Sequence, residues 1–266
     1  MLKMLMKKGA TARRVYRQEG LTGVIAVVQA RARFTKAVLH AFVSGDLVEL
    51  DGCYFRLNRQ IVPARLKAEF VLDIYEKPER IAIQQFVHPI NPVIEMGGGI
   101  GVISCITNKR LRNARQHLVV EANPLLIPSL EDSRQRNACQ FEIVQAAIGY
   151  TGDQTTLFVQ RRFVLSSLIR ASGQAVQVST MTLQKLLERA DWKDTKITLI
   201  CDIEGMEYDL IVKEIDTIRQ HVATLVIEIH PEFLDAAALS RIRSELEKHY
   251  FQLIHQNGKL HVFKAA

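Results

Sequence analysis

Short apolar runs of strand length recur along the chain and alternate with segments of helical periodicity. These runs cover residues 92–96, 117–121, 141–148, 196–203 and 224–229. Such alternation predicts an α/β fold in which a mostly parallel, doubly wound sheet carries helices on both faces. Near the end of the chain, runs 251–255 and 259–263 flank Asn257-Gly258, a hairpin turn that reverses direction. We therefore expect an antiparallel C-terminal hairpin to close the sheet.

The chain before this alternation predicts a separate extension. Residues 47–50 and 53–57 flank Asp51-Gly52, a strong two-residue hairpin signal. Helices are expected over 66–74 and 80–86, and Pro78 can begin the second one. The expected division has three parts, which are a basic helical N-terminal extension (1–45), a hairpin with helices leading into the core (46–90), and the sheet domain (91–266).

A glycine-rich turn follows the run that ends at Met96. Gly97, Gly99 and Gly101 leave backbone without Cβ atoms, so a cofactor can lie directly on the chain while residues 102–111 form a helix. A dinucleotide fingerprint requires its third glycine where Val102 stands. Glycines two residues apart are instead expected where S-adenosylmethionine is held. We therefore predict S-adenosylmethionine as the cofactor.

A second acid supports a nucleotide site. Glu121 ends the run 117–121, about twenty residues after the glycines, where a carboxylate can accept two hydrogen bonds from a ribose diol. A helix is expected from Pro124 to about residue 137, with Pro128 able to delay its start. The residues expected to bind the cofactor are the three glycines of the turn together with Glu95, Glu121, Ala122, Asn123 and Asp202.

Four segments also resemble a known family. VIEMGGGIGVIS, LVVEANP, TLICDIEGMEYDLI and LVIEIHP occur in this order. They resemble the signature blocks D-x-G-x-N-x-G, E-P, K-x-D-x-E-G-x-E and E-x-H of FkbM-type S-adenosylmethionine-dependent methyltransferases, over about residues 75–230. Glu95 stands where that family usually has Asp, and Gly99 where Asn is common. The resemblance implies a class I methyltransferase-like Rossmann fold, and a cofactor-side loop at Tyr75-Glu76.

Two predicted strands end in pairs of ionisable residues. Asp202 and Glu204 follow one strand, and Glu228 and His230 follow the other, so each pair projects to one side if its strand stays extended. Methylating a hydroxyl requires proton removal, and His230 oriented by Glu228 is the preferred base, with Glu204 as the alternative. A Mg²⁺ ion held by some of Asp202, Glu204 and Glu228 is the competing scheme, which we do not favour. The main prediction therefore contains no metal site.

The predicted function is O-methylation of a hydroxyl on a carbohydrate, glycan or secondary metabolite. Asp202 is also a candidate for holding the ammonium group of the cofactor. Two other classes stay open from the sequence. One is a non-catalytic cofactor-binding module that docks on a membrane-associated assembly. The other is an NAD-dependent oxidoreductase, which the residue at position 102 and the antiparallel ending disfavour.

Charge is distributed unevenly along the chain. Residues 1–41 contain nine Lys or Arg and one acid, so the remaining sequence has 26 bases and 27 acids. This distribution argues against a basic nucleic-acid groove in the catalytic part. The basic segment 1–41 can instead contact an anionic membrane surface or a protein partner. Its apolar stretch 21–30 is too short to cross a bilayer.

The four cysteines show no paired spacing. They lie at positions 53, 105, 139 and 201, far apart and without a C-x-x-C motif. This pattern indicates neither a zinc site nor a disulfide framework, and it suits a reducing compartment. We expect a cytoplasmic protein, with peripheral membrane contact through the N-terminal segment as the remaining option.

Overall fold

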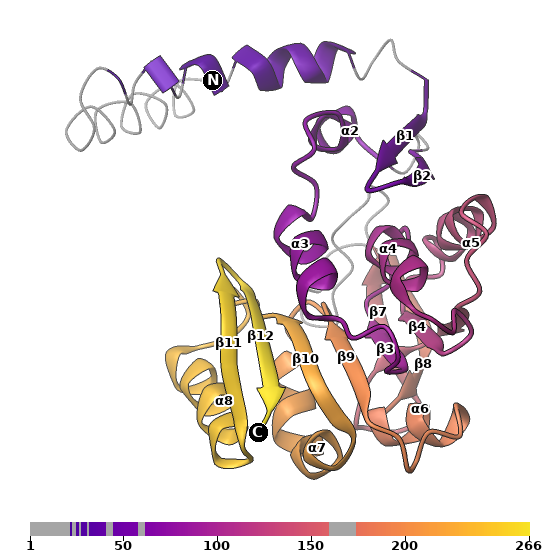
Figure 1. Ribbon diagram of the computed structural model, residues 1–266, viewed down its shortest axis with the longest axis vertical. Helices are drawn as coiled ribbons and strands as arrows, with labels where there is room; N and C mark the ends of the chain where they lie inside the picture. The colour runs from indigo at the N-terminus through magenta and orange to yellow at the C-terminus, as the bar shows by residue number, and fades with distance from the viewer. Residues whose placement is uncertain are drawn as a thin grey trace.

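A seven-stranded sheet forms the centre of the molecule. The computed structural model describes residues 22, 25–26, 28–30, 32–40, 45–57, 62–159 and 174–266. The strand order is β11-β12-β10-β9-β3-β4-β5 (Figure 1). The strands are β3 (Val93–Met96), β4 (His117–Glu121), β5 (Glu142–Gln145), β9 (Ile197–Cys201), β10 (Val222–Glu228), β11 (Phe251–Asn257) and β12 (Leu260–Ala265). β12 pairs antiparallel with β10 and β11, and the other pairs are parallel. The predicted parallel sheet with an antiparallel C-terminal hairpin is confirmed.

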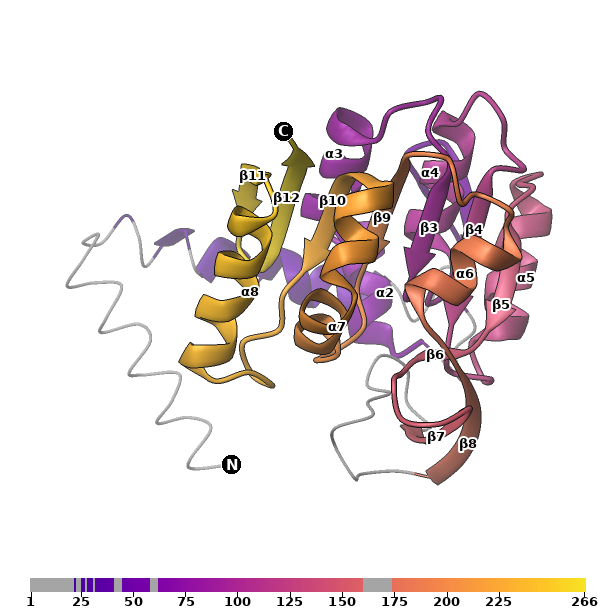
Figure 2. The ribbon, with the colours of Figure 1, turned by 90° about the horizontal axis from the view of Figure 1, so that it is seen from below.

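Helices cover both faces of this sheet, as Figure 2 shows. Helices α3 (Lys77–Phe86), α4 (Val102–Arg110) and α5 (Ile127–Arg136) contribute to one core, and α6 (Leu183–Arg189), α7 (Glu207–His221) and α8 (Ala236–Lys248) to the other. Successive strand residues alternate between them, so that Val93 and Val119 face the first core while Ile94 and Leu118 face the second. Both faces are therefore apolar, which explains the continuous hydrophobic runs in the sequence.

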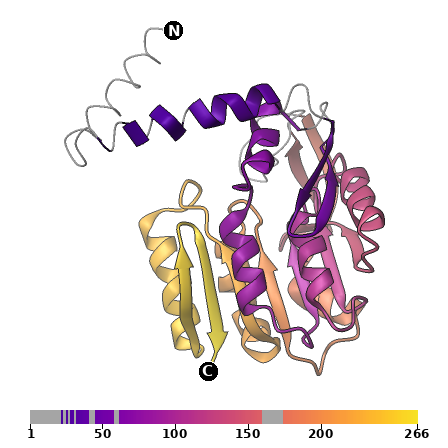
Figure 3. The same ribbon diagram turned by 45° about the horizontal axis from the view of Figure 1, so that its top comes forward.

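The segment before the sheet forms the predicted hairpin and helices. Strands β1 (Leu47–Leu50) and β2 (Cys53–Arg56) pair antiparallel, and Asp51 and Gly52 have φ values of 48° and 74° in the turn between them. Helix α2 (Ala64–Val71) follows. Residues 32–40 are helical and lie beside α2, where the Arg65 guanidinium sits 5.8 Å from the centroid of the Phe34 ring (Figure 3).

Most of the basic segment 1–41 lies outside the described residues, so its predicted role stays a prediction. Within the described ranges, none of the helices combines the length and the apolar composition that crossing a bilayer demands.

The prediction of one strand over 141–148 is wrong. β5 ends at Gln145, and the Ala146 N–H donates to the carbonyl of Glu121 as the chain leaves the main sheet. β6 (Ala147–Ile148) then joins a second sheet of order β6-β8-β7, with β7 (Gln154–Val159) and β8 (Gln174–Met181). Helix α5 begins after Pro124, with Pro128 in its first turn.

Candidate active site

A cavity of about 190 Å³ opens at the carboxyl ends of β3, β4, β9 and β10. Open α/β sheets bind their ligands at this edge. Seven acidic residues line the cavity, namely Glu76, Glu79, Glu95, Glu121, Asp202, Glu204 and Glu228. Over the part of the chain that the structure describes, the lining contains no Lys or Arg. The cavity lining is therefore rich in acidic groups.

The glycine turn forms one wall of this cavity. Gly97 has a φ of +97°, and a Cβ there would collide with the backbone carbonyl of Asp202. Gly99 has a φ of +54° and no other atom within 4 Å of its Cβ direction, so its open side is free for a ligand. Gly101 does not line the cavity, because it faces α5, where a Cβ would lie 2.9 Å from Leu130 Cδ1. The first and second predicted glycines thus border the cavity, and the third packs a helix.

Glu121 clamps the glycine turn to the end of β4. Its Oε2 accepts a hydrogen bond from the Gly99 N–H at 2.7 Å, and its Oε1 accepts one from the Asn123 N–H at 2.6 Å. Burial raises the pKa of Glu121 to about 7, although the backbone donors of Asn123, Gly99 and Ala122 act to lower it. Ala122 lines the cavity, whereas Asn123 lies outside the lining and bonds the Leu125 N–H through its side chain.

Glu95 reaches the cavity, but its oxygens already have partners. Its Oε1 accepts from Ser104 Oγ at 2.6 Å, and its Oε2 lies 3.1 Å from His117 Nε2. The Glu95 side chain is 1% exposed. These contacts connect β3 with β4 and α4 next to the glycine turn. Glu95 therefore has a structural role in holding the turn in place.

The Tyr75-Glu76 loop closes another side. Arg80, which is 3% exposed, donates from Nε to the carbonyl of Tyr75 at 2.9 Å and binds the carboxylates of Asp51 and Asp73 at 2.7 Å. Glu76 lies in the left-handed region with a φ of 45°. Burial raises the pKa of Glu76 to about 8, opposed by its bond to Tyr75. Arg80 therefore fixes a strained loop that presents a carboxylate to the cavity.

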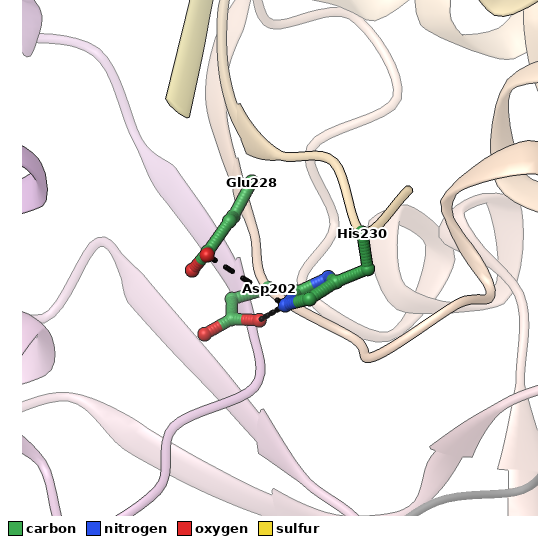
Figure 4. A group of neighbouring side chains, drawn as sticks. All are labelled: Asp202, Glu228 and His230. Carbon is green, nitrogen blue, oxygen red and sulfur yellow. Dashed lines mark ion pairs between the residues drawn. The ribbon is translucent and has the colours of Figure 1, made fainter. Parts of the chain in front are cut away.

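Two of the predicted catalytic side chains, Glu228 and His230, converge with the predicted cofactor ligand Asp202 where β9 and β10 end (Figure 4). His230 Nε2 lies 3.7 Å from Asp202 Oδ1 and 3.7 Å from Glu228 Oε1. Its Nδ1 lies 2.7 Å from Oε1 of Glu207, which is fully buried in the first turn of α7. Asp202 and Glu228 line the cavity, while His230 stands behind them. The Asp202 side chain is 45% exposed because it faces the open cavity.

This arrangement determines the charge of His230. Burial acts to lower the pKa of His230, but the hydrogen bond with Glu207 and the carboxylates of Asp202 and Glu228 raise it to about 9. Loss of bulk solvent around its carboxyl group inside the cavity also raises the pKa of Asp202 to about 7, opposed by the charge of His230. With nothing else bound, the imidazole is protonated at pH 7, so it must lose a proton before it can accept one.

Glu204 does not join the other three side chains. The expectation that Asp202 and Glu204 project to the same side required an extended chain, but β9 ends at Cys201. Glu204 has a φ of 47° and Gly205 a φ of 106°, so the backbone turns before α7. Glu204 still lines the cavity, and burial raises its pKa.

Sequence reasoning missed the partner of the histidine. Glu207 stood within the acidic segment after β9, but no spacing rule connects it with a histidine 23 residues later. Arg80 also gave no signal, since a single arginine in an amphipathic helix is usually exposed. The acidic Glu79 on α3 was likewise not anticipated as part of the cavity lining.

The fold and the site define a class of protein, which is a methyltransferase with the class I Rossmann-like fold. The Methyltransferase FkbM domain family matches residues 95–253, which is more than half of the chain. The chain therefore belongs to the FkbM methyltransferase family, and the predicted resemblance is confirmed. No curated protein matches this sequence.

Several solved structures are similar in fold only. A methyltransferase from Pyrococcus furiosus is 11% identical, with 89% of this chain and 98% of that chain covered and a TM-score of 0.46. A precorrin-6y C5,15-methyltransferase from Geobacter metallireducens is 12% identical, with 72% and 89% covered and a TM-score of 0.44. TYW2 from M. jannaschii, in complex with AdoMet, is 12% identical, with 84% and 88% covered and a TM-score of 0.41.

Proposed function

We propose that this S-adenosylmethionine-dependent methyltransferase methylates a hydroxyl oxygen of a neutral acceptor, such as a carbohydrate, glycan or secondary metabolite. The acidic cavity is the observation that carries the proposal. Seven acidic side chains line the cavity and, among the residues that the structure describes, no Lys or Arg does; this lining favours a positively charged ligand such as the cofactor and opposes a ligand that brings phosphates. The acidic lining would repel the pyrophosphate of a dinucleotide. This repulsion and the glycine spacing both argue against an NAD-dependent oxidoreductase.

The residues present fit the cofactor. The open backbone at Gly99 leaves room beside the chain, and the Glu121 carboxylate can accept hydroxyl hydrogen bonds in addition to its backbone donors. Asp202, Glu76 and Glu204 also line the cavity, and the backbone of Asp202 lies directly against Gly97 of the glycine turn. Bound S-adenosylmethionine supplies an electrophilic methyl group on a positively charged sulfur.

The acceptor side of the cavity is built from carboxylates. Asp202 and Glu228 lie at the open end, where their oxygens can accept hydrogen bonds from acceptor hydroxyl groups. The same charges repel phosphates, which supports the expectation that nucleic acid is not the substrate. Glu204, Glu228 and His230 remain the candidates for removing the hydroxyl proton, because each lies at this end of the cavity or directly behind it.

A transfer assay with labelled cofactor tests this function. The full chain is incubated with methyl-labelled S-adenosylmethionine and with neutral glycans, hydroxylated metabolites, amines and nucleic acids as separate arms. We expect label only on neutral hydroxyl acceptors, and loss of about a hundredfold or more in turnover for His230→Ala with cofactor affinity nearly unchanged. Label on amines or nucleic acids alone would refute O-methylation. Cofactor binding without transfer in any arm would favour a non-catalytic module.

We also propose peripheral contact between the basic segment 1–41 and an anionic membrane or a protein partner in the cytoplasm. Its nine bases against one acid support this proposal. None of the four cysteines, all of which the structure describes, forms a disulfide, which is compatible with that compartment.

A further inference from the structure

His230, Asp202 and Glu228 bring three side chains of metal-ligand type together at one end of the cavity. His230 Nε2 lies 3.7 Å from each carboxylate, and the three ligand-type atoms all lie within 4.8 Å of one another. A direct hydrogen bond requires about 2.7–3.2 Å, so neither contact is one. Two ligands of one metal ion at about 2.1 Å from it stand roughly 3.0–3.4 Å apart. The two contacts are ion pairs a few tenths of an ångström longer than this ligand spacing, so a small movement of the three side chains would let them share one ion.

Glu207 fixes the histidine in the orientation that a metal ligand needs. An ionised carboxylate only accepts hydrogen bonds, so the 2.7 Å contact places the Nδ1 proton toward Glu207 and turns Nε2 toward Asp202 and Glu228. Glu207 is fully buried, and its Oε2 has no hydrogen-bond partner. A buried carboxylate that orients a histidine through its second nitrogen is the usual outer partner of a metal-binding imidazole.

Carboxyl groups outnumber the basic side chains around His230. Asp202, Glu204, Glu207 and Glu228 bring four carboxyl groups to this end of the cavity. Lys259 acts on this group from a distance, but its Nζ is held by Glu232 at 2.6 Å. An ammonium group of a ligand would satisfy the carboxylates without using Nε2 of the histidine. A metal dication uses all three side chains.

We propose that Asp202, Glu228 and His230 bind a first-row divalent metal ion, with Glu207 as the positioning residue. One imidazole and two carboxylates suit Mn²⁺ or a neighbouring ion better than Mg²⁺, which prefers oxygen ligands alone. This ligand set differs from the Asp202, Glu204 and Glu228 set considered from the sequence, because His230 takes the place of Glu204. Three protein ligands leave coordination positions open toward the cavity. An acceptor oxygen can occupy one of them, a role that rests on the proposed O-methylation; with His230 and Glu228 bound to the ion, Glu204 is the candidate that still accepts the hydroxyl proton.

Metal binding is measured directly on the full chain. The protein is stripped with a chelator, desalted and titrated with Mn²⁺, and the free ion is followed by its electron paramagnetic resonance signal. We expect one saturable Mn²⁺ site per chain that Mg²⁺ displaces poorly. His230→Ala and Glu228→Gln should each weaken binding by about tenfold or more, and Glu207→Gln should weaken it by about 10–100-fold through the histidine alone. Glu228→Gln serves as the second variant if His230→Ala fails to fold.

Glu232→Gln is the matched control, because it removes one nearby carboxylate that binds Lys259 at the surface. It should leave Mn²⁺ affinity within about twofold. The inference is overturned if Mn²⁺ shows no saturable binding, or if His230→Ala and Glu228→Gln, both folded, bind it as tightly as the natural chain. Titration of the metal-free protein with S-adenosylmethionine separates the two proposals. Cofactor binding without Mn²⁺ binding removes the metal site alone, whereas Mn²⁺ binding without cofactor binding removes the proposed function.

Discussion

Replacing Glu121 tests the cofactor site most directly. Glu121→Ala removes a carboxylate that receives two short backbone hydrogen bonds, from Gly99 at 2.7 Å and from Asn123 at 2.6 Å, and that faces the cavity. A hydrogen-bonding charged group is worth about 1.5–3 kcal/mol, which corresponds to roughly a ten- to hundredfold loss in affinity. Glu121→Gln should fall near the lower end, because its amide oxygen keeps one backbone donor while its NH₂ group faces the other. Calorimetric titration with S-adenosylmethionine measures both variants.

Glu142→Ala is the control for this experiment. Glu142 lies on the neighbouring strand β5, is half exposed and pairs with Arg189 away from the cavity. Its loss should leave cofactor affinity unchanged, since exposed ion pairs contribute little. If folded Glu121→Ala, with the circular dichroism spectrum of the natural chain, binds the cofactor as tightly as Glu142→Ala does, the ribose lies elsewhere and our assignment of the cavity is refuted.

Three further predictions follow from the described contacts. Burial raises the pKa of Glu121 from 4.5 to about 7, so folded protein binds this proton more tightly than unfolded protein. This group should therefore lower the free energy of unfolding by up to about 3 kcal/mol as the pH rises from 4.5 past 7. Urea titrations at several pH values measure this, and the free energy of unfolding of Glu121→Gln should depend less on pH than that of the natural chain. Gly101→Ala should lower the free energy of unfolding by about 2 kcal/mol, because its methyl meets Leu130 at positive φ, and an unchanged urea midpoint would contradict this packing. Deleting 1–41 should abolish sedimentation with anionic liposomes at low salt while cofactor affinity stays the same, and a full chain that never sediments would remove the membrane proposal.

The sequence was most informative where one local pattern determined one element. The runs at β3, β4, β9 and β10 are apolar on both faces of a covered sheet, so their pattern and the sheet class agree. The run 141–148 was predicted as one strand because its apolar residues continue from β5 into β6, and hydrophobicity does not reveal that the chain changes sheets at Ala146. Strand β8 gave no clear signal because polar and small residues fill its exposed positions.

The candidate site was predictable in its residue types more than in its geometry. Glu121 and the glycines were found because strand ends at one edge of a sheet meet. Glu204 lies away from Asp202, Glu228 and His230 because its backbone is left-handed. A glutamate in the sequence does not predict that conformation. The contact between Glu207 and His230 joins the start of a helix to the end of a different strand, so it arises only from the tertiary fold.

Arg80 and the β1–β2 hairpin determine where the shortest active fragment of the chain can begin. Arg80 links Asp51 in the hairpin turn to the loop that holds Glu76 at the cavity. Phe55 of the hairpin is fully buried in the same core as Leu130. A fragment that starts at residue 91 would keep the family signature but lose the loop that closes the cavity and expose part of that core. We expect the minimal active fragment to begin ahead of β1, so the limits of the recognisable family domain and the limits of the autonomous catalyst do not coincide.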